Sequence, residues 1–201
     1  MKTFRSIMSW VIPVALGLAV ALILNVFVVQ RVKVDGPSMQ PNLQNNEKVW
    51  TFKQAKIHRG SVIVFDANGV DLQVTSKTNY VKRVIAVGGD TVESKNGNLY
   101  VNGKKVSQSY ISSYQRTTGT GNWTLQSISI KNGWLKYNGA TKVSKGYYFV
   151  LGDHRSVSND SRYWGFVPKS KILGVVKVAP WSGTKTTRYN INQFWKHYFK
   201  N

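Results

Sequence analysis

The hydrophobic residues divide the chain into one long apolar run near the start and many short runs after it. Residues 10–29 form a stretch of twenty residues without a charge. At a rise of about 1.5 Å per residue, a helix of that length crosses a hydrocarbon layer of about 30 Å. Pro13 and Gly17 do not argue against this helix, because lipid offers the backbone no better hydrogen-bonded alternative. We predict a transmembrane anchor over residues 10–29, preceded by a short segment over residues 1–9.

A cleavable signal peptide is the alternative interpretation of the same run. Lys2 and Arg5 precede it, and Ala19-Val20-Ala21 has the small-x-small pattern of a cleavage site. The apolar core of a signal peptide is only about 7 to 15 residues long and ends before its cleavage site. Here apolar residues continue to position 29, which favours a retained anchor.

Beyond Val32 the pattern changes to short β-branched and aromatic runs, broken by Gly, Asn and Asp and with little 3.6-residue periodicity. Such a pattern is typical of a mostly β domain. Asn96-Gly97 and Asn102-Gly103 are dipeptides that favour tight hairpin turns. We predict strands over residues 48–52, 61–65, 80–87, 99–101, 127–130, 147–151 and 174–178.

The composition of the second half predicts its subdivision. Residues 91–145 are rich in Ser, Thr, Asn, Gly and Lys, and we interpret them as an inserted β subdomain with its own small sheet. They interrupt a main β domain over residues 32–90 and 146–181. Residues 182–201 mix basic with aromatic residues and are too short and too charged to span a membrane. We therefore expect them to form an exposed or membrane-surface tail.

Charge and cysteine content limit the classes of partner and of chemistry. Lys and Arg total 28 against 8 Asp and Glu, a formal net charge of +20, and there is no cysteine. Such an excess of positive charge indicates an anionic partner, either nucleic acid or anionic lipid, and the anchor favours lipid. The lack of cysteine excludes disulfides, thiol nucleophiles and Cys-ligated zinc.

Ser38 is the candidate nucleophile. It lies in the segment Val34-Asp35-Gly36-Pro37-Ser38-Met39-Gln40-Pro41, where each proline fixes its own φ and restricts the residue before it. A Gly/Pro loop that merely joins an anchor to a domain has the same composition. Two further segments distinguish these interpretations: Tyr80 to Asp90, YVKRVIAVGGD, and Gly152 to Pro168, GDHRSVSNDSRYWGFVP.

Together the three segments resemble the conserved boxes of the type I signal peptidases, of the compact single-span kind found in Gram-positive bacteria. The resemblance implies a signal-peptidase and LexA-like β-rich fold, anchored in the plasma membrane with a cytoplasmic N-terminus and an extracellular catalytic domain. It also implies that a serine nucleophile and a lysine general base remove signal peptides from exported preproteins after Ala-x-Ala-like sites, through an acyl-enzyme. Neither a metal nor a cofactor is expected.

A serine hydroxyl needs a base, and the chain offers few histidines for that role. Of His58, His154 and His197, only His154 lies in one of the three segments, so it is the one candidate for a histidine triad. Lysine is the alternative. A free lysine has a pKa of about 10.4 and is neutral in about one copy in 2,500 at pH 7, so it must be buried to act as a base.

Lys82 has the sequence context for such burial. In a strand over residues 80–87 its side chain shares a face with Val84 and Ala86, while Arg83 points to the other face and can pair with a carboxylate. Four of the eight acidic residues lie in or beside the three segments, which predicts specific ion pairs. These four are Asp35, Asp90, Asp153 and Asp160.

The resemblance assigns supporting roles to further residues. It implies that Ser158 hydrogen-bonds the lysine amine and that Arg83, Asp153, Asp160 and Arg162 form a charged network behind the site. The chain departs from the family pattern twice: His154 replaces an asparagine, and Gly36 stands where some members have an oxyanion-stabilising serine. Because Gly36 has no hydroxyl, the resemblance implies that the Ser38 N–H is the main hydrogen-bond donor to the oxyanion.

Two other classes of function remain open at this point. One is a non-catalytic relative that binds exported chains or assists pilus assembly, against which the intact Ser38, Lys82 and Ser158 argue. The other is a nucleic-acid-binding protein, for which only the net charge speaks. Any such polycation binds DNA in a salt-sensitive way, so charge alone does not favour this function. We expect signal peptides and anionic membrane lipid as partners, and no nucleic acid.

Overall fold

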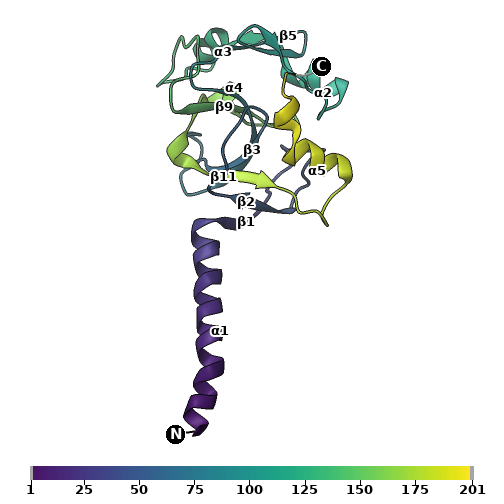
Figure 1. Ribbon diagram of the computed structural model, residues 1–201. Helices are drawn as coiled ribbons and strands as arrows, with labels where there is room; N and C mark the ends of the chain where they lie inside the picture. Colours follow the sequence, from purple (N-terminus) through teal and green to yellow (C-terminus); the bar gives the residue numbers. More distant parts are fainter. Residues whose placement is uncertain (1, 200–201) are drawn as a thin grey trace.

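The computed structural model describes residues 2–199; the side chains of residues 2–8, 23 and 24 fall outside the description, and with them the charged groups of Lys2 and Arg5. Lys200 of the expected tail also lies outside the described residues. Helix α1 (Lys2–Phe27) projects as an isolated rod from a β-rich body (Figure 1). Its stretch from Ser9 to Phe27 is long and apolar enough to cross a membrane. This apolar helix fits the predicted membrane anchor.

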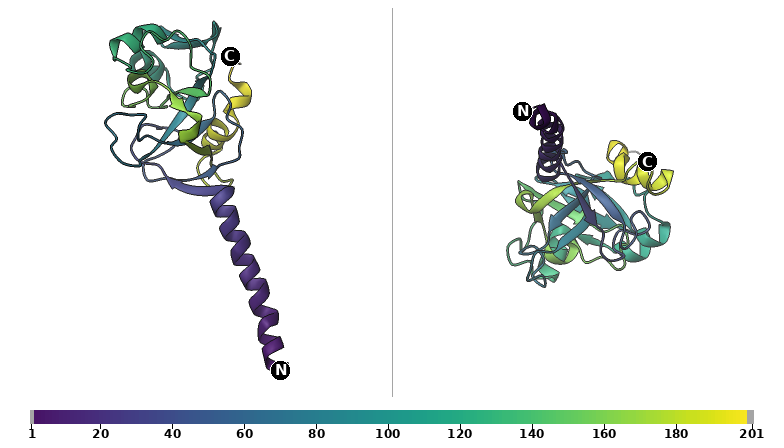
Figure 2. Two further views of the ribbon diagram at one scale, coloured as in Figure 1. Left: turned by 90° about the vertical axis from the view of Figure 1, so that its left-hand side faces the viewer. Right: turned by 90° about the horizontal axis from the view of Figure 1, so that it is seen from below.

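The body is built on a seven-stranded antiparallel sheet in the order β1-β2-β11-β3-β4-β9-β10. The prediction of a mostly β domain is confirmed, and the strands over residues 48–52 and 147–151 have the predicted bounds. Figure 2 shows that α1 joins the body directly at β1. The strands are β1 (Val29–Lys33), β2 (Lys48–Phe52), β3 (Val62–Asp66), β4 (Asn79–Val87), β9 (Tyr147–Leu151), β10 (Val167–Pro168) and β11 (Ile172–Lys177).

A second sheet of four short strands lies at the end of the body far from α1 (Figure 1). Both of its predicted hairpin turns are confirmed, because Asn96, Gly97, Asn102 and Gly103 all have φ between 50° and 74°. The two sheets share one apolar cluster. In the order β7-β6-β5-β8, the strands are β7 (Lys104–Lys105), β6 (Asn98–Val101), β5 (Val92–Lys95) and β8 (Trp123–Thr124).

The strand predicted over residues 127–130 is wrong, since these residues belong to helix α3 (Leu125–Lys131). The Thr124 side chain accepts from the Ser127 N–H, and the Ser127 hydroxyl accepts from the Thr124 N–H. This reciprocal capping box starts the helix. Leu125 and Ile128, three residues apart, then face the core, so the alternation of Ser and Ile that indicated a strand has no structural meaning here.

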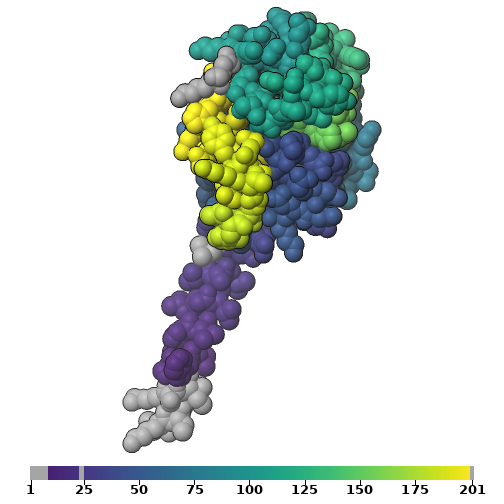
Figure 3. All heavy atoms as spheres, turned by 90° about the vertical axis from the view of Figure 1, so that its right-hand side faces the viewer, coloured from purple at the N-terminus to yellow at the C-terminus, as the bar shows by residue number. Residues whose placement is uncertain are grey.

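Of the two expectations for residues 182–201, an exposed tail or a membrane-surface tail, the first is wrong. Residues 185–197 form helix α5 (Lys185–Asn192) and a 3-10 turn, η2 (Phe194–His197). Figure 3 shows the segment, in yellow, lying along the body. Asn190, Ile191, Phe194 and Tyr198 are buried, and their spacing of three and four residues is that of one helical face. Polar residues between them, among them Lys196, conceal this pattern in the sequence. The remaining short elements are α2 (Ser113–Thr120), α4 (Ser161–Trp164) and η1 (Lys169–Lys171).

Candidate active site

Ser38 lies in a turn that is held by backbone hydrogen bonds on both sides. The Gln40 N–H donates to Pro37 O at 3.0 Å, and the Leu43 N–H donates to Met39 O at 3.0 Å. From across the body, the His154 N–H donates to Ser38 O at 3.0 Å. The half-buried serine is therefore fixed by its own loop and by the loop that follows β9.

Lys82 lies in the middle of β4 and is only 4% exposed. Its Nζ is 2.8 Å from Ser38 Oγ, a hydrogen-bonding distance. The Tyr80 ring lies beside the amine, with its centroid 5.1 Å from Nζ. The structure thus brings together the predicted nucleophile and the predicted base, which lie 44 positions apart in the sequence.

The predicted alternation along β4 holds only for its first half. A register shift lies between Val84 and Ala86. As a result Ile85 and Ala86 both join the core cluster shared with the small sheet, so Ala86 does not continue the Lys82 face as expected. Val84 keeps the predicted Lys82 face, because it packs in one cluster with Ile63, which lies directly opposite Lys82 on β3.

Burial lowers the pKa of the Lys82 amine from its ordinary value of 10.5 to about 8. The carboxylates of Asp160, Asp153 and Asp71 oppose this effect and favour the ammonium. At a pKa of about 8, about one amine in ten is neutral at pH 7, several hundred times the fraction of a free lysine. A neutral amine at this distance is able to accept a proton from a serine hydroxyl.

Ser158 lies beside this pair but does not make the expected hydrogen bond. Its Oγ is buried, and within the described part of the chain no atom hydrogen-bonds to it. The glycine at position 152 allows Ser158 and the Ser38 loop to approach the backbone closely. A Cβ on Gly152 would collide with the Ser158 side chain and lie 2.5 Å from Ser38 O. Ser158 therefore faces the nucleophile loop with an unused hydroxyl.

Gly36 is required by the backbone, because its φ of 78° is one that side chains disfavour. Its N–H donates to Asn45 Oδ1 at 2.9 Å and is not free to bind an oxyanion. A Cβ at this position would meet no atom within 4 Å. The strained backbone, not a lack of room, thus disfavours a serine here.

Arg83 points away from Lys82 and is fully buried. Its Nε and Nη2 donate to the two oxygens of Asp153 at 2.8 and 2.7 Å, and its Cζ lies 4.0 Å from the centroid of the Tyr110 ring. Such a two-pronged pair has a fixed geometry. It attaches β4 to the turn that contains Gly152 and His154.

A second ion pair, between Arg162 and Asp160, also contacts this turn. Arg162 Nε and Nη2 donate to the Asp160 carboxylate at 2.9 and 3.0 Å, and the Gly152 N–H donates to Asp160 Oδ2 at 3.0 Å. Arg155, which we did not predict as a site residue, donates to Gly152 O at 3.1 Å. The four residues predicted as a charged network thus form two ion pairs, one on each side of the turn.

The other acidic residues near the site differ in their partners. Asp90 pairs with Arg59 at 2.6 Å, as expected, whereas Asp35 is exposed. Asp71, which we did not predict, is buried and accepts from Tyr80 OH at 3.1 Å and from Asn159 Nδ2 at 2.7 Å. Its only signal in the sequence is the scarcity of carboxylates.

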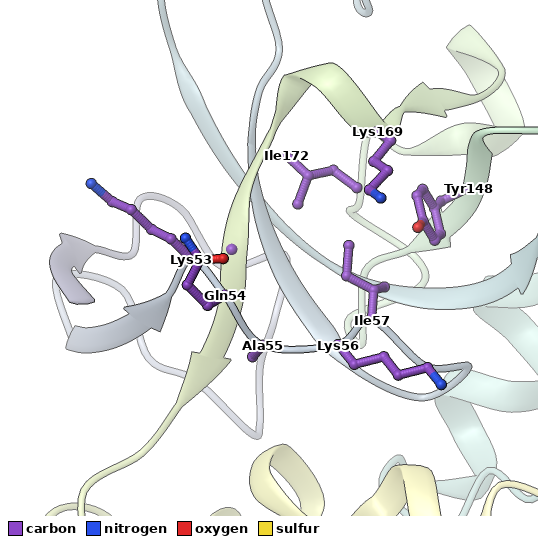
Figure 4. A pocket seen from close by; sticks show the side chains of 9 residues that line it. Lys53, Gln54, Ala55, Lys56, Ile57, Tyr148, Lys169 and Ile172 are labelled. Atoms are coloured by element: carbon purple, nitrogen blue, oxygen red, sulfur yellow. The ribbon is translucent and has the colours of Figure 1, made fainter. Parts of the chain in front are cut away.

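The structure has a cavity of about 450 Å³ that is separate from Ser38 and Lys82. Figure 4 shows that the ammonium groups of Lys53 and Lys56, two of its lining residues, point away from each other. They do not converge on an anion. Across residues 2–199, no group of His, Asp and Glu has the arrangement needed to hold a metal ion.

Comparisons with known proteins agree with this geometry. Residues 7–181 match the family described as "Signal peptidase, peptidase S26". The chain is 34% identical to Signal peptidase IB of Staphylococcus aureus (strain MRSA252) over 192 residues, 94% of this chain and 96% of the relative. It is 32% identical to Signal peptidase I of Bacillus licheniformis over 176 residues, 85% of this chain and 86% of the relative.

A solved structure is similar as well. It is the crystal structure of a signal peptidase I from Enterococcus faecalis V583, with a TM-score of 0.50 and 32% sequence identity. The match covers 60% of this chain and 97% of that structure. The mostly β fold and its sequence pattern therefore occur together in a solved relative.

Proposed function

Because the chain belongs to the signal peptidase family, peptidase S26, we propose that Ser38 is its nucleophile and Lys82 its general base. The chain is an enzyme of the signal peptidase I type, which removes signal peptides as a serine peptidase. The observation that carries this proposal is the 2.8 Å separation between Ser38 Oγ and a buried amine. Signal peptides of exported preproteins are its substrates.

In the acylation step, the neutral Lys82 amine takes the proton from Ser38 Oγ as the oxygen attacks the scissile carbonyl carbon. The carbonyl oxygen becomes an oxyanion, and the Ser38 N–H is the proposed donor to it. When the tetrahedral intermediate collapses, the Lys82 ammonium returns its proton to the leaving amine. The product is an acyl-enzyme ester on Ser38 and a free mature N-terminus.

Deacylation repeats the same proton transfers with water. Lys82 is neutral again after the amine leaves, and it accepts a proton from a water molecule that attacks the ester carbonyl. The second tetrahedral intermediate then releases Ser38, which recovers its proton from the ammonium. Ser158, with its free buried hydroxyl beside the loop, is a candidate to orient the amine during these transfers.

We further propose cleavage after Ala-x-Ala-like sites, with the N-terminus of α1 in the cytoplasm and the catalytic body outside. The net charge of +20 supports attraction of the body to anionic lipid headgroups. In this arrangement α1 holds the catalytic body at the membrane from which a signal peptide emerges.

Cleavage of a model preprotein ending its signal peptide in Ala-x-Ala tests the proposal. The full-length wild type should produce one new N-terminus at that site, and Ser38→Ala and Lys82→Ala should produce none. Lys82→Arg should also fail, because a guanidinium stays charged at neutral pH. Turnover by folded Lys82→Ala at the wild-type rate would overturn the mechanism. An intact wild type that neither cleaves the preprotein nor reacts with a serine-directed acylating probe would indicate a non-catalytic relative.

A further inference from the structure

The C-terminal segment, residues 182–199, lies beyond the match to the family model, which ends at residue 181. It nevertheless touches both the loop of Ser38 and the strand of Lys82. We propose that Asn190, on α5, is a positioning residue of the catalytic site and joins these two parts. This inference rests on the proposed roles of Ser38 and Lys82.

The first connection runs from Asn190 to the nucleophile loop. Asn190 Nδ2 donates to Asn42 Oδ1 at 2.7 Å, and Asn42 Nδ2 donates both to Asp153 Oδ2 and to Tyr110 O, each at 2.8 Å. A carboxylate and a backbone carbonyl only accept, so the orientation of the Asn42 amide is fixed and its oxygen needs a donor. Asn190 supplies that donor.

The second connection runs from Asn190 to the strand of the base. Arg83 Nη1 donates to Asn190 O at 2.9 Å and to Gly60 O at 2.9 Å. The carbonyls in the last turn of a helix lack partners within that helix, and its C-terminal end attracts cations. Asn190 O is such a carbonyl. This carbonyl therefore gives the Arg83 guanidinium a hydrogen-bond acceptor in addition to the Asp153 carboxylate.

Apolar contacts support both connections. Ile191 packs in one cluster with Met39 and Leu43 of the nucleophile loop. The Phe194 ring centroid lies 5.4 Å from the Arg83 guanidinium, and Tyr198 OH donates to Ile85 O on β4. Asn190 therefore lies between the loop of Ser38 and the strand of Lys82, and residues on both sides of it in the sequence contact the same two parts.

Loss of the Asn190 amide leaves Asn42 Oδ1 buried without a donor. A buried acceptor without a donor costs free energy, and a shift of the surrounding chain that brings a new donor to it relieves this cost. Asn42 lies four residues after Ser38, so the rearrangement displaces Ser38 Oγ from Lys82 Nζ. Reaction rates depend steeply on such distances, because a misplacement of about 1 Å can cost about a hundredfold.

Two leucine variants in the same helix test this role. Asn190→Leu removes the donor to Asn42 and keeps the number and branching of the side-chain heavy atoms. Asn192→Leu is the matched control, because among the described residues Asn192 Nδ2 and Oδ1 bond only to Val178 O and N, on the segment after β11. Each full-length variant is assayed in detergent with the model preprotein, and the concentration of active sites is titrated with a serine-directed acylating probe.

We expect Asn190→Leu to lower kcat per titrated site by at least about tenfold, with little change in KM, through misplacement of Ser38. Asn192→Leu should keep the wild-type kcat. A purely structural role would lower the titrated fraction and leave kcat per site unchanged. That result, an equal loss in both variants, or a wild-type kcat in Asn190→Leu would overturn the inference. Failure of the wild type to cleave while Ser38→Ala behaves identically would instead refute the proposed function.

Discussion

At the scale of single residues, the unusual feature is a lysine that is buried beside an alcohol without a directly bonded carboxylate. Lys82 is 4% exposed, and its side chain hydrogen-bonds Ser38. The carboxylates of Asp153 and Asp160 are occupied by Arg83 and Arg162. Because these arginines neutralise much of the nearby negative charge, burial dominates and the amine stays partly neutral.

The same burial has a cost in stability that Lys82→Met should reveal. The pKa of Lys82 is lower in the folded state, about 8, than its ordinary value of 10.5. The unfolded state therefore binds more protons between these values, and wild-type stability rises with pH across that window. Below pH 8 the buried amine costs about 3 kcal/mol.

Lys82→Met should accordingly be more stable than the wild type at pH 7, by about 2 kcal/mol once the lost hydrogen bond is subtracted. This advantage should shrink toward pH 10. Denaturant unfolding of both proteins over this pH range measures the difference. A variant less stable than the wild type at pH 7 would contradict the account.

Asp71 provides a second prediction at this scale. Its carboxylate favours the Lys82 ammonium, and it contacts the site through Tyr80 OH at 3.1 Å. Removing this charge by Asp71→Asn should lower the pKa of Lys82 and move the midpoint of the kcat/KM profile to lower pH. Asp66→Asn, a carboxylate paired with Lys171 at 3.7 Å, is the matched control. A midpoint that moves to higher pH in Asp71→Asn would exclude this role.

At the scale of elements, the strands follow from the sequence more readily than the helices. β2 and β9 are runs of β-branched and aromatic residues, and the hairpins follow from Asn-Gly pairs. Helix α3 is seven residues long and depends on a capping box, and α5 depends on packing against the body. Neither feature produces a strong pattern in a short stretch of sequence.

The capping box of α3 can be tested directly. Thr124→Ala removes the side-chain acceptor for the Ser127 N–H and should lower the free energy of unfolding by about 1 kcal/mol. Thr124→Ser keeps a hydroxyl and should keep most of the stability. Because α3 does not contact Ser38 or Lys82, kcat per active site should be unchanged. Equal stability of Thr124→Ala and the wild type would show that packing alone holds the helix.

Sequence motifs identify the proposed reacting residues but not the contacts that position them. Ser38 and Lys82 are found because they lie in recognisable segments. The bond between Asn190 and Asn42 joins positions 148 apart, and no local pattern predicts such a contact. Ser158 illustrates the opposite case: its motif is present, but its expected hydrogen bond is not formed, because the hydroxyl lies beside the Gly152 turn and not on the amine.

At the scale of the whole molecule, the anchor and the body are nearly independent. Side chains of α1 between residues 9 and 22 are exposed, and the helix projects away from the sheet (Figure 1). The body reaches the end of α1 through Lys53 Nζ, which donates to Val26 O at 2.6 Å, and through Gln54 Nε2, which donates to Phe27 O at 3.3 Å. Helix α1, which fits a membrane anchor, therefore does not form part of the candidate site.

Deletion of residues 2–27 should separate these roles. We expect the rate on a membrane-embedded preprotein to fall by at least about tenfold, because the effective concentration of enzyme at the membrane is lost. The rate on a soluble Ala-x-Ala peptide should stay within about twofold, since the anchor adds only local concentration. Equal losses on both substrates would show that α1 also supports the catalytic body.

The central claim is that a buried, neutral Lys82 activates Ser38, and the pH dependence of kcat/KM tests it most directly. With the full-length wild type and a soluble peptide, kcat/KM should rise about tenfold per pH unit on the acid side and level off above a midpoint near 8, the pKa of Lys82. Lys82→Ala should lose both the activity and this titration. A flat wild-type profile, or a Lys82→Ala enzyme that keeps the wild-type rate and midpoint, would contradict the account.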